Sequence, residues 1–458
     1  MLHYLKTDWE TLKELVRLSM PMVISQGAFA IMMFTDRYFM SQLSPLHLSA
    51  ALGGGVAAFF CVSLFVGMLS YGNSIVAQYF GANDHAKCSK VLTQSLILAM
   101  MSYPLILLMG FAMEDIFRWM DHPENQIQLE VSYFNLLIIG SVITLIKTAL
   151  ASYFSGVGRT SVVMTSNLVG VVLNIPLSYV LIFGEYGFPA WGIIGAAIGT
   201  LISSGLTLAI LLGYYFAKEN RIQFSVMESF GWHSAILKRY VRLGLPSGLE
   251  AFLNISAFNL FILMFQSYGV VEGASAAIVL NWDILSFVPM FGIHIAVSSL
   301  VGRYIGANKM ERVTSVISSG FILALSYSAL LGVMFIIFRD PMVGMFVDGD
   351  EQGQKIQALA SWMMVGMASY VMADAVILVA GGALRGAGDT KWLMYTSTFL
   401  HWAMAVAQYV VIEILEYGPD VSWVIFVSML ITLALAYTSR LIGPKWRHPE
   451  VIKRMLAE

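Results

Sequence analysis

Residues 16–21, Val-Arg-Leu-Ser-Met-Pro, recur almost unchanged as residues 241–246, Val-Arg-Leu-Gly-Leu-Pro, and this recurrence decides the fold. A second motif repeats at the same offset: Gln-Tyr-Phe-Gly-Ala-Asn at 78–83 returns as Arg-Tyr-Ile-Gly-Ala-Asn at 303–308. A third follows in the same order at a slightly longer offset, because Gly-Val-Gly-Arg-Thr at 156–160 is matched by Gly-Ala-Gly-Asp-Thr at 386–390. Three matches in one order predict that the chain is an internal duplication.

The stretches between these motifs have the composition of a membrane protein. Hydrophobic residues make up 58% of the chain and charged residues only 12%, whereas a soluble domain carries roughly 25% charged residues. Apolar windows reach or exceed the roughly 20 residues that cross a bilayer. We expect twelve membrane-spanning helices, at residues 14–40, 50–78, 90–112, 129–154, 162–184, 190–217, 239–268, 274–300, 314–338, 356–384, 392–413 and 420–442.

Lys and Arg are distributed unevenly between the two sides of these spans. Of the 26 such residues, 21 (Arg385 among them) lie in the termini and the loops on their side, 3 lie in the opposite loops, and Arg37 and Lys147 lie inside spans. Basic residues accumulate on the cytoplasmic side of membrane proteins, so both termini are predicted to be cytoplasmic. The net charge of −2, without a basic tail, gives no indication of nucleic-acid binding.

Six spans in each repeat is an even number, so both repeats enter the membrane from the same side. The repeats are therefore parallel, with a pseudo-twofold axis along the membrane normal. The predicted fold is an all-α membrane protein with an N-lobe (1–217), a cytoplasmic linker loop (218–238) and a C-lobe (239–458) around a central cleft. Rocking of the lobes would give alternating access, and one chain would suffice as a monomer.

Several motifs together resemble the multidrug and toxic compound extrusion (MATE) family over essentially the whole chain. They are Pro21 with Asp36, and residues 78–82, 174–184, 195–197 and 382–390. The resemblance implies a secondary antiporter in the cytoplasmic (inner) membrane of a bacterium, surrounded by lipid. It would exchange small organic compounds for protons or sodium ions, and it would need no cofactor.

Asp36 is the predicted coupling acid of the N-lobe. In relatives this carboxylate belongs to the N-lobe coupling site, where it would bind and release a proton or cation. The alternative is a structural partner of a neighbouring helix such as Lys147, which could instead hold carbonyl groups at a helix break. Archaeal proton-coupled relatives carry an aspartate four residues after the position of Asn174, where this chain has Ser178. A single acid with a neutral neighbour favours a proton over sodium.

Asp374 and Tyr370 lie one helical turn apart, so they share a face of their helix. Both match positions that relatives use in a C-lobe cation site, and their oxygens suit a hard cation such as Na⁺. Asp283, which follows Asn281, could complete a cluster with Asp374 and Glu250, or it could serve as a local polar partner. Aromatic packing is the alternative role for Tyr370.

Glu250 departs from the family pattern. Sodium-type relatives carry their glutamate where this chain has Asn254, so Glu250 lies one turn closer to the cytoplasm. It could serve the same cleft from this shifted depth, or it could be a hydrated residue at the cytoplasmic end. Pro21 lies inside a predicted span, where proline removes a backbone hydrogen bond. It could be a hinge that moves when Asp36 changes protonation, or a static kink.

The substrate class is suggested by the resemblance more than by composition. The 28 Met, 28 Phe, 20 Tyr and 10 Trp would suit an adaptable pocket for lipophilic cations, but lipid-facing helices use the same residues. The main rival is a flippase for a lipid-linked precursor, which needs a basic cleft for pyrophosphate. With Arg37 and Lys147 as the intramembrane bases against four acids, the sequence disfavours that rival. No metal-ligand or nucleophile pattern predicts an enzyme.

Overall fold

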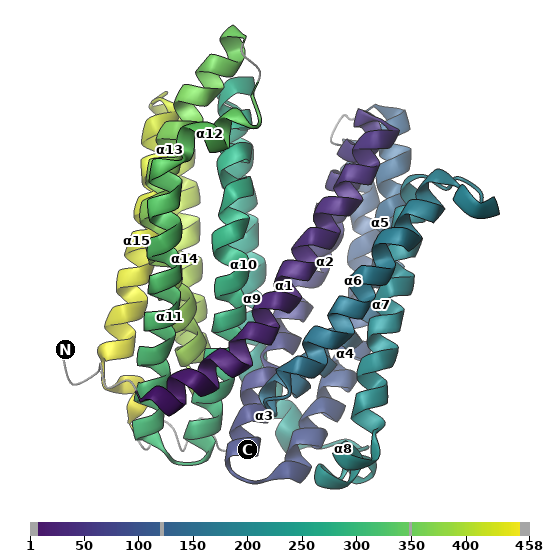
Figure 1. Cartoon of the computed structure of the whole chain (residues 1–458), viewed down its shortest axis with the longest axis vertical. Helices are drawn as coiled ribbons and strands as arrows, with labels where there is room; N and C mark the ends of the chain where they lie inside the picture. Colours follow the sequence, from purple (N-terminus) through teal and green to yellow (C-terminus); the bar gives the residue numbers. More distant parts are fainter. Residues whose placement is uncertain (1–7, 120–122, 348–349, 449–458) are drawn as a thin grey trace. The chain divides into compact units, whose positions relative to one another are not determined.

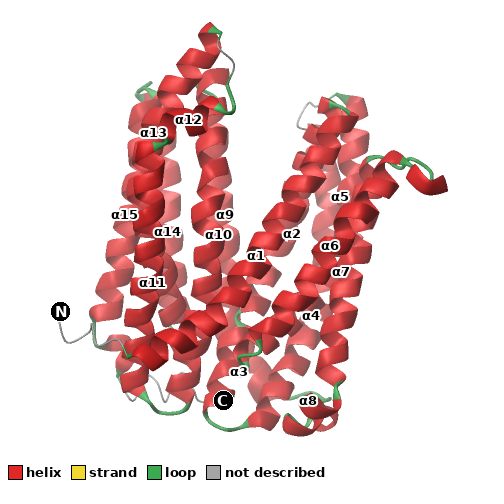
Figure 2. Ribbon diagram, viewed as in Figure 1, coloured by secondary structure: helices red, strands yellow, loops and turns green. Residues whose placement is uncertain are grey.

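The computed structural model describes residues 8–119, 123–347 and 350–448, and this part of the chain contains helices and no strand (Figure 2). The helices are α1 (Trp9–Leu43), α2 (Pro45–Ser70), α3 (Gly72–Gly81), α4 (His85–Trp119), α5 (Glu124–Gly156), α6 (Thr160–Phe183), α7 (Ile193–Phe216), α8 (Lys218–Gln223), α9 (Ser234–Gln266), α10 (Val270–Gly306), α11 (Met310–Ile337), α12 (Arg339–Gly344), α13 (Glu351–Ala387), α14 (Thr390–Tyr409) and α15 (Pro419–Ile442). Short turns of 3₁₀ or π helix lie at η2 (Glu185–Gly187), η3 (Val226–Glu228), η4 (Val410–Ile414) and η5 (Lys445–Arg447).

Twelve helices in the described residues are long and apolar enough to cross a membrane. Each overlaps one of the twelve predicted spans, so the all-helical, twelve-span fold is confirmed. The second span, Leu46–Gly81, joins α2 to α3. A helix satisfies its own backbone hydrogen bonds, which is why an apolar chain in lipid adopts it. The terminal basic residues Lys6, Lys453 and Arg454, which contribute to the predicted orientation, lie outside the described residues.

The duplication is visible in the backbone. Asn83 and Asn308, the last residues of the second repeated motif, both adopt left-handed conformations, with φ of 61° and 56°. Gly158 and Gly388, which correspond in the third motif, do the same after α5 and α13, with φ of 82° and 91°. Asn and Gly are the residues that tolerate this region of backbone space. The repeated motifs therefore end corresponding helices with the same turn.

Matching glycines also permit matching helix crossings. A Cβ atom on Gly156 would lie 2.7 Å from the carbonyl oxygen of Asn73, and one on Gly386 would lie 2.6 Å from that of Ser298. Asn73 and Ser298 are themselves corresponding positions of the repeat. Real side chains do not approach backbone this closely, so both crossings require glycine. The same contact thus joins α5 to α3 and α13 to α10.

The chain divides into two compact units. The first contains the described residues of Met1–Val23, Glu250–Ile305 and Lys309–Ala457, and the second contains Ile24–Leu249 and Gly306–Asn308. In the first unit α13 packs against α11 and α15, and in the second α5 packs against α2, α4 and α7 (Figure 1). Helices α5 and α13 occupy corresponding positions in the two repeats, so each unit is built around the same element.

Helices α1 and α9 each change units along their length. Helix α1 passes from the first unit to the second after Val23, and α9 passes from the second to the first after Leu249. Each passage follows a proline within the helix, Pro21 in α1 and Pro246 in α9. The predicted N-lobe and C-lobe follow the sequence repeat, so their boundaries differ from those of the two compact units. The lobe boundaries stay a prediction.

Residues 218–238 are a folded segment. Asn220 of α8 is completely buried, and its side chain donates to the carbonyl oxygen of Tyr215 at 2.9 Å. The same side chain accepts hydrogen bonds from Tyr153 at 3.3 Å and Arg159 at 3.2 Å. The segment is therefore anchored to the ends of α5 and α7, whereas the sequence suggested a polar loop.

Candidate functional site

The first group of predicted residues lies in the second compact unit, around Asp36 of α1. The hydroxyl groups of Ser178 in α6 and Thr200 in α7 face its carboxylate. One carboxylate oxygen of Asp36, Oδ1, is buried and forms no hydrogen bond with the described residues. Burial of an oxygen without a partner is unfavourable. Asp36 therefore presents a buried acceptor that a proton or cation could satisfy.

Asn174 extends this group along α6. Its side chain is fully buried, and Nδ2 donates to Ser203 Oγ of α7 at 3.2 Å. Its Oδ1 is a second buried oxygen that has no hydrogen-bond partner in the described ranges. Since Asn174 and Ser178 are one turn apart, they share a face of α6. We call Asp36, Asn174, Ser178 and Thr200 the N-terminal polar cluster.

The position of α1 against α6 follows from local packing. Ala28 and Met32 of α1 form an apolar cluster with Val171 of α6. A hydrogen bond of 2.6 Å from Asn167 Nδ2 to Ser25 Oγ joins the same two helices. This contact holds the Asp36 face of α1 toward α6. Thr200 lies on α7, so a sequence pattern on α1 alone could not identify it as a neighbour of Asp36.

Lys147 is not the partner of Asp36 in this structure. It lies on α5, half-buried, and no ion pair of Lys147 occurs in the part of the chain described. The structural alternative for Asp36 therefore lacks its suggested partner. Arg37, next to Asp36, is exposed on the surface of the helix.

The second group lies in the first compact unit, where α10 approaches α13. Asp283 of α10 interacts electrostatically with Asp374 of α13, and both interact with Tyr370. Asp283 Oδ1 accepts a hydrogen bond of 2.6 Å from Ser286 Oγ. We call Asp283, Asp374 and Tyr370 the acidic pair cluster. Three predicted residues from two helices are thus brought together.

Aromatic packing, one of the two roles that the sequence left open for Tyr370, is present in the structure. Its side chain is only 1% exposed, and its ring packs edge-on against Phe426 at 5.6 Å and Trp423 at 6.3 Å. Its hydroxyl group is nevertheless buried without a hydrogen-bond partner among the residues described. Aromatic packing therefore fixes the ring and directs a polar atom toward two carboxylates.

Glu250 does not join these acids. Its Oε1 forms an ion pair of 2.8 Å with Arg385 Nη2 and accepts a hydrogen bond of 3.1 Å from the hydroxyl of Tyr437. Arg385 follows Asp374 by eleven residues on α13, which is roughly 16 Å along a helix. The three-acid cluster that included Glu250 is therefore not formed. The alternative of a freely hydrated Glu250 is also wrong, because its side chain is 3% exposed.

Arg385 is the partner of Glu250 that sequence analysis missed. It was counted among the loop residues, but it lies in the last turn of α13 and its side chain is 24% exposed. A charged residue that follows the apolar run 375–384 and lies between glycines 382 and 386 was the available signal.

The remaining predicted residues have local roles. Asn254 Nδ2 donates to Ser397 Oγ at 2.7 Å, whereas Asn281 is exposed and lies outside the acidic pair cluster. His294 and His401 bind backbone oxygens, each at 2.8 Å. The described residues contain no group of three or more His, Cys, Asp or Glu that could hold a metal ion.

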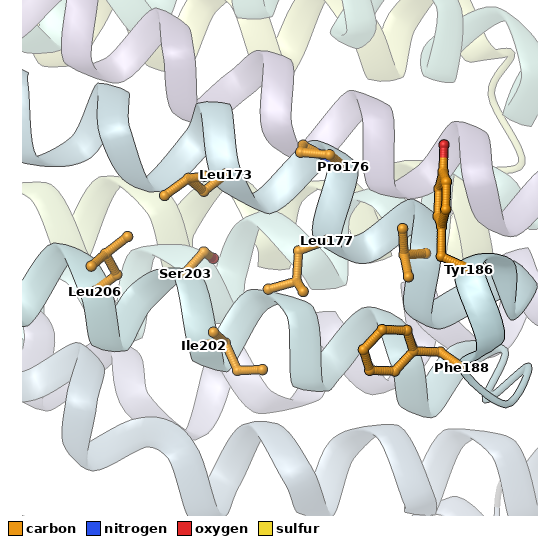
Figure 3. A pocket seen from close by; sticks show the side chains of 9 residues that line it. Leu173, Pro176, Leu177, Tyr186, Phe188, Ile202, Ser203 and Leu206 are labelled. Carbon is orange, nitrogen blue, oxygen red and sulfur yellow. The ribbon is translucent and has the colours of Figure 1, made fainter.

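An apolar groove with a cavity volume of about 420 Å³ lies on the outside of the second unit, between α6 and α7. Figure 3 shows Leu173 and Leu177 of α6 opposite Ile202 and Leu206 of α7. No predicted site residue lines it. Ser203, at its base, is the residue that binds Asn174. The groove therefore lies behind the N-terminal polar cluster and is separate from it.

Comparison with known proteins covers most of the chain. The MatE family model matches residues 21–180 and 246–410. "Probable multidrug resistance protein NorM" of Thermotoga maritima is 26% identical over 455 residues, covering 97% of this chain and 95% of that protein. "Multidrug resistance protein NorM" of Vibrio cholerae is 27% identical over 396 residues, covering 86% of this chain and 85% of that protein.

Solved structures share the fold. A MOP superfamily transporter from Pyrococcus furiosus matches with a TM-score of 0.87 at 21% identity, covering 100% of this chain and 98% of that one. A MATE protein in complex with MaL6 matches with a TM-score of 0.86 at 21% identity, covering 99% of both chains. The two segments of the family match begin at Pro21 and Pro246, which are corresponding positions of the first repeated motif. This chain belongs to the MatE family.

Proposed function

We propose that this protein is a secondary active exporter that exchanges organic compounds, chiefly lipophilic cations, for protons or sodium ions across the cytoplasmic membrane of a bacterium. One observation carries the proposal. Each compact unit contains an acid-bearing cluster with a buried, unpartnered oxygen in the described residues: Asp36 Oδ1 in one and Tyr370 Oη in the other. Charged groups inside membrane helices are costly and mark ion pathways.

In the N-terminal polar cluster, Asp36 is the only acid, and its neighbours Asn174, Ser178 and Thr200 are neutral. A carboxylate in such surroundings is stabilised when a proton or cation neutralises it. A single acid can be neutralised by one proton, which supports a proton over sodium here. Release of that ion on the other side would restore the charge and complete the exchange.

In the acidic pair cluster, two carboxylates compete for the same space. Like charges held close together disfavour double ionisation, so Asp283 and Asp374 would share one bound cation. That cation could be a proton, or it could be Na⁺ with Tyr370 as a further oxygen ligand. This cluster is where sodium coupling would act if the protein uses it.

The membrane potential drives the exchange when net positive charge enters, as when one ion enters for a neutral substrate or two ions enter for a monovalent cation. A potential of 100 mV supplies about 2.3 kcal/mol per charge that crosses, which is roughly a fifty-fold concentration ratio for a neutral substrate. Transport would proceed by rocking of the two parallel repeats, with Pro21 as a hinge and both termini in the cytoplasm. A monomer surrounded by lipid would suffice. We propose neither a cofactor nor an enzymatic activity.

A flippase for a lipid-linked precursor remains the alternative. That activity requires basic groups for pyrophosphate. Arg385 adds a base within a span, but its charge is engaged by Glu250. Acidic groups that could bind a cation thus still outnumber the basic groups that could bind pyrophosphate. We therefore prefer the exporter to the flippase.

The deciding experiment uses purified protein in proteoliposomes loaded with an amphiphilic cationic dye. Efflux is measured under an imposed pH gradient and, separately, under an imposed sodium gradient. The proposal expects one gradient to drive efflux and expects Asp36→Asn to reduce it severely at unchanged protein level. Efflux that ignores both gradients, or that is normal in Asp36→Asn, would contradict it. Movement of a lipid pyrophosphate without dye efflux would establish the flippase instead.

A further inference from the structure

A second groove lies where the chain enters α9, in the second compact unit. Its cavity volume is about 490 Å³, and it is lined by Trp232, Ser234, Leu237, Lys238, Val241 and Arg242. No predicted coupling residue borders it. The lining spans the boundary between the polar segment before α9 and the beginning of the candidate membrane span Ser234–Gln266. The groove is therefore placed where lipid headgroups meet the protein.

The surface of the groove is almost entirely apolar, so Lys238 and Arg242 line it with their methylene stems, beside Leu237 and Val241. Lys238 and Arg242 are both exposed and four residues apart, so they lie on one face of α9. Leu237 and Val241 are also four residues apart and form the neighbouring apolar strip. The one acid of the preceding turn η3, Glu228, is not part of the lining. Such a surface is complementary to a molecule with an anionic head and an apolar tail.

The aromatic edge of the groove is held in place. Trp232 is 61% exposed, yet a completely buried residue, Gln94 of α4, fixes the backbone on both sides of it. Gln94 Nε2 donates to the carbonyl oxygen of Gly231 at 2.8 Å, and its Oε1 accepts from the backbone N–H of His233 at 3.2 Å. An exposed indole on an anchored backbone indicates a binding surface, and Trp is enriched at the lipid headgroup level.

We infer that this groove binds an anionic phospholipid. Lys238 and Arg242 bind the phosphate, an acyl chain lies along Leu237 and Val241, and Trp232 packs at the level of the glycerol. A lipid fits better than a soluble anion because the apolar strip continues into a membrane-spanning helix. A bound lipid would stabilise the entry to α9, which also contains Pro246. The inference does not depend on the proposed transport activity.

The test measures lipid retention and thermal unfolding of the full-length protein. Purified protein is exchanged into micelles with either phosphatidylglycerol or phosphatidylcholine, and bound lipid is counted by native mass spectrometry. We expect the wild type to retain phosphatidylglycerol and to unfold at a higher temperature in its presence. In the variant Lys238→Gln/Arg242→Gln the affinity should fall roughly thirtyfold, from about fivefold for each basic group removed.

The matched control is Lys218→Gln/Arg221→Gln, which removes two exposed charges from α8 of the same unit, outside the groove. Retention in the control together with loss in the groove variant supports the site. Equal loss in both variants, or none in either, overturns it, as does equal stabilisation by inorganic phosphate. If the double variant does not fold, Lys238→Gln and Trp232→Ala are tested singly, and wild-type retention in both refutes the inference.

Discussion

The ion pair between Glu250 and Arg385 separates two interpretations of Glu250, as a coupling acid or as a structural anion. The perturbation is to neutralise each partner singly and then both together. In Glu250→Gln the guanidinium of Arg385 loses the carboxylate of Glu250, but it is 24% exposed and so stays partly hydrated. We therefore expect a loss of stability at the lower end of the range for a broken buried ion pair, about 3 kcal/mol. In Arg385→Gln the carboxylate is left at 3% exposure, and the loss should approach about 5 kcal/mol.

The double variant Glu250→Gln/Arg385→Gln carries no unpaired charge, so it should recover to within about 1 kcal/mol of the wild type. Stability is measured by thermal unfolding in detergent, and function by dye efflux from proteoliposomes. If Glu250 is a structural anion, efflux returns with stability in the double variant.

The opposite result would refute this reasoning. A Glu250→Gln protein that is as stable as the wild type but does not export, and that is not rescued by Arg385→Gln, would show that Glu250 carries the coupling ion. The matched control is another largely buried ion pair of the same unit, Arg440 Nε with Asp389 Oδ2 at 2.7 Å. Its single and double neutralisations should show the same pattern of stability.

Three further predictions follow from the clusters and the repeat. Asp374→Asn should remove the ion dependence of efflux, and Tyr370→Phe should weaken only its sodium dependence. Both are measured as transport rate against ion concentration, and unchanged profiles would exclude the acidic pair cluster from ion coupling. Gly386→Val should abolish folding, because its side chain meets a backbone oxygen at 2.6 Å, whereas Gly205→Ala has no neighbour within 4 Å and should be tolerated in the same thermal assay. Asn308→Ala should cost about 1–2 kcal/mol at its left-handed φ while Asn308→Gly should not, and equal effects of the two would contradict the strain argument.

Much of the site was visible in the sequence because it depends on spacing along one helix. Tyr370 and Asp374 are four residues apart, so α13 alone places them on one face. Asp36 and Asn174 were identified by resemblance, and the structure supplies the contact between α1 and α6 that puts their faces together. Their role in ion coupling stays a prediction.

Pairings between helices were harder to predict. The sequence left two roles open for Asp283, a cluster with Asp374 and Glu250 or a local polar contact. It did not indicate the ion pair between Glu250 and Arg385. Two neighbouring spans can be rotated against one another without changing the hydropathy of either. The partner of a buried charge is therefore decided by helix crossings, such as the one that Gly386 permits against α10.

The sequence by itself determined the twelve spans and the duplication of a six-span unit, because hydropathy and repeated motifs are properties of consecutive residues. Only the tertiary structure decided that Glu250 is neutralised by Arg385 while Asp283 faces Asp374. The depth and rotation of each helix are set by packing against its neighbours, and a linear pattern does not record them.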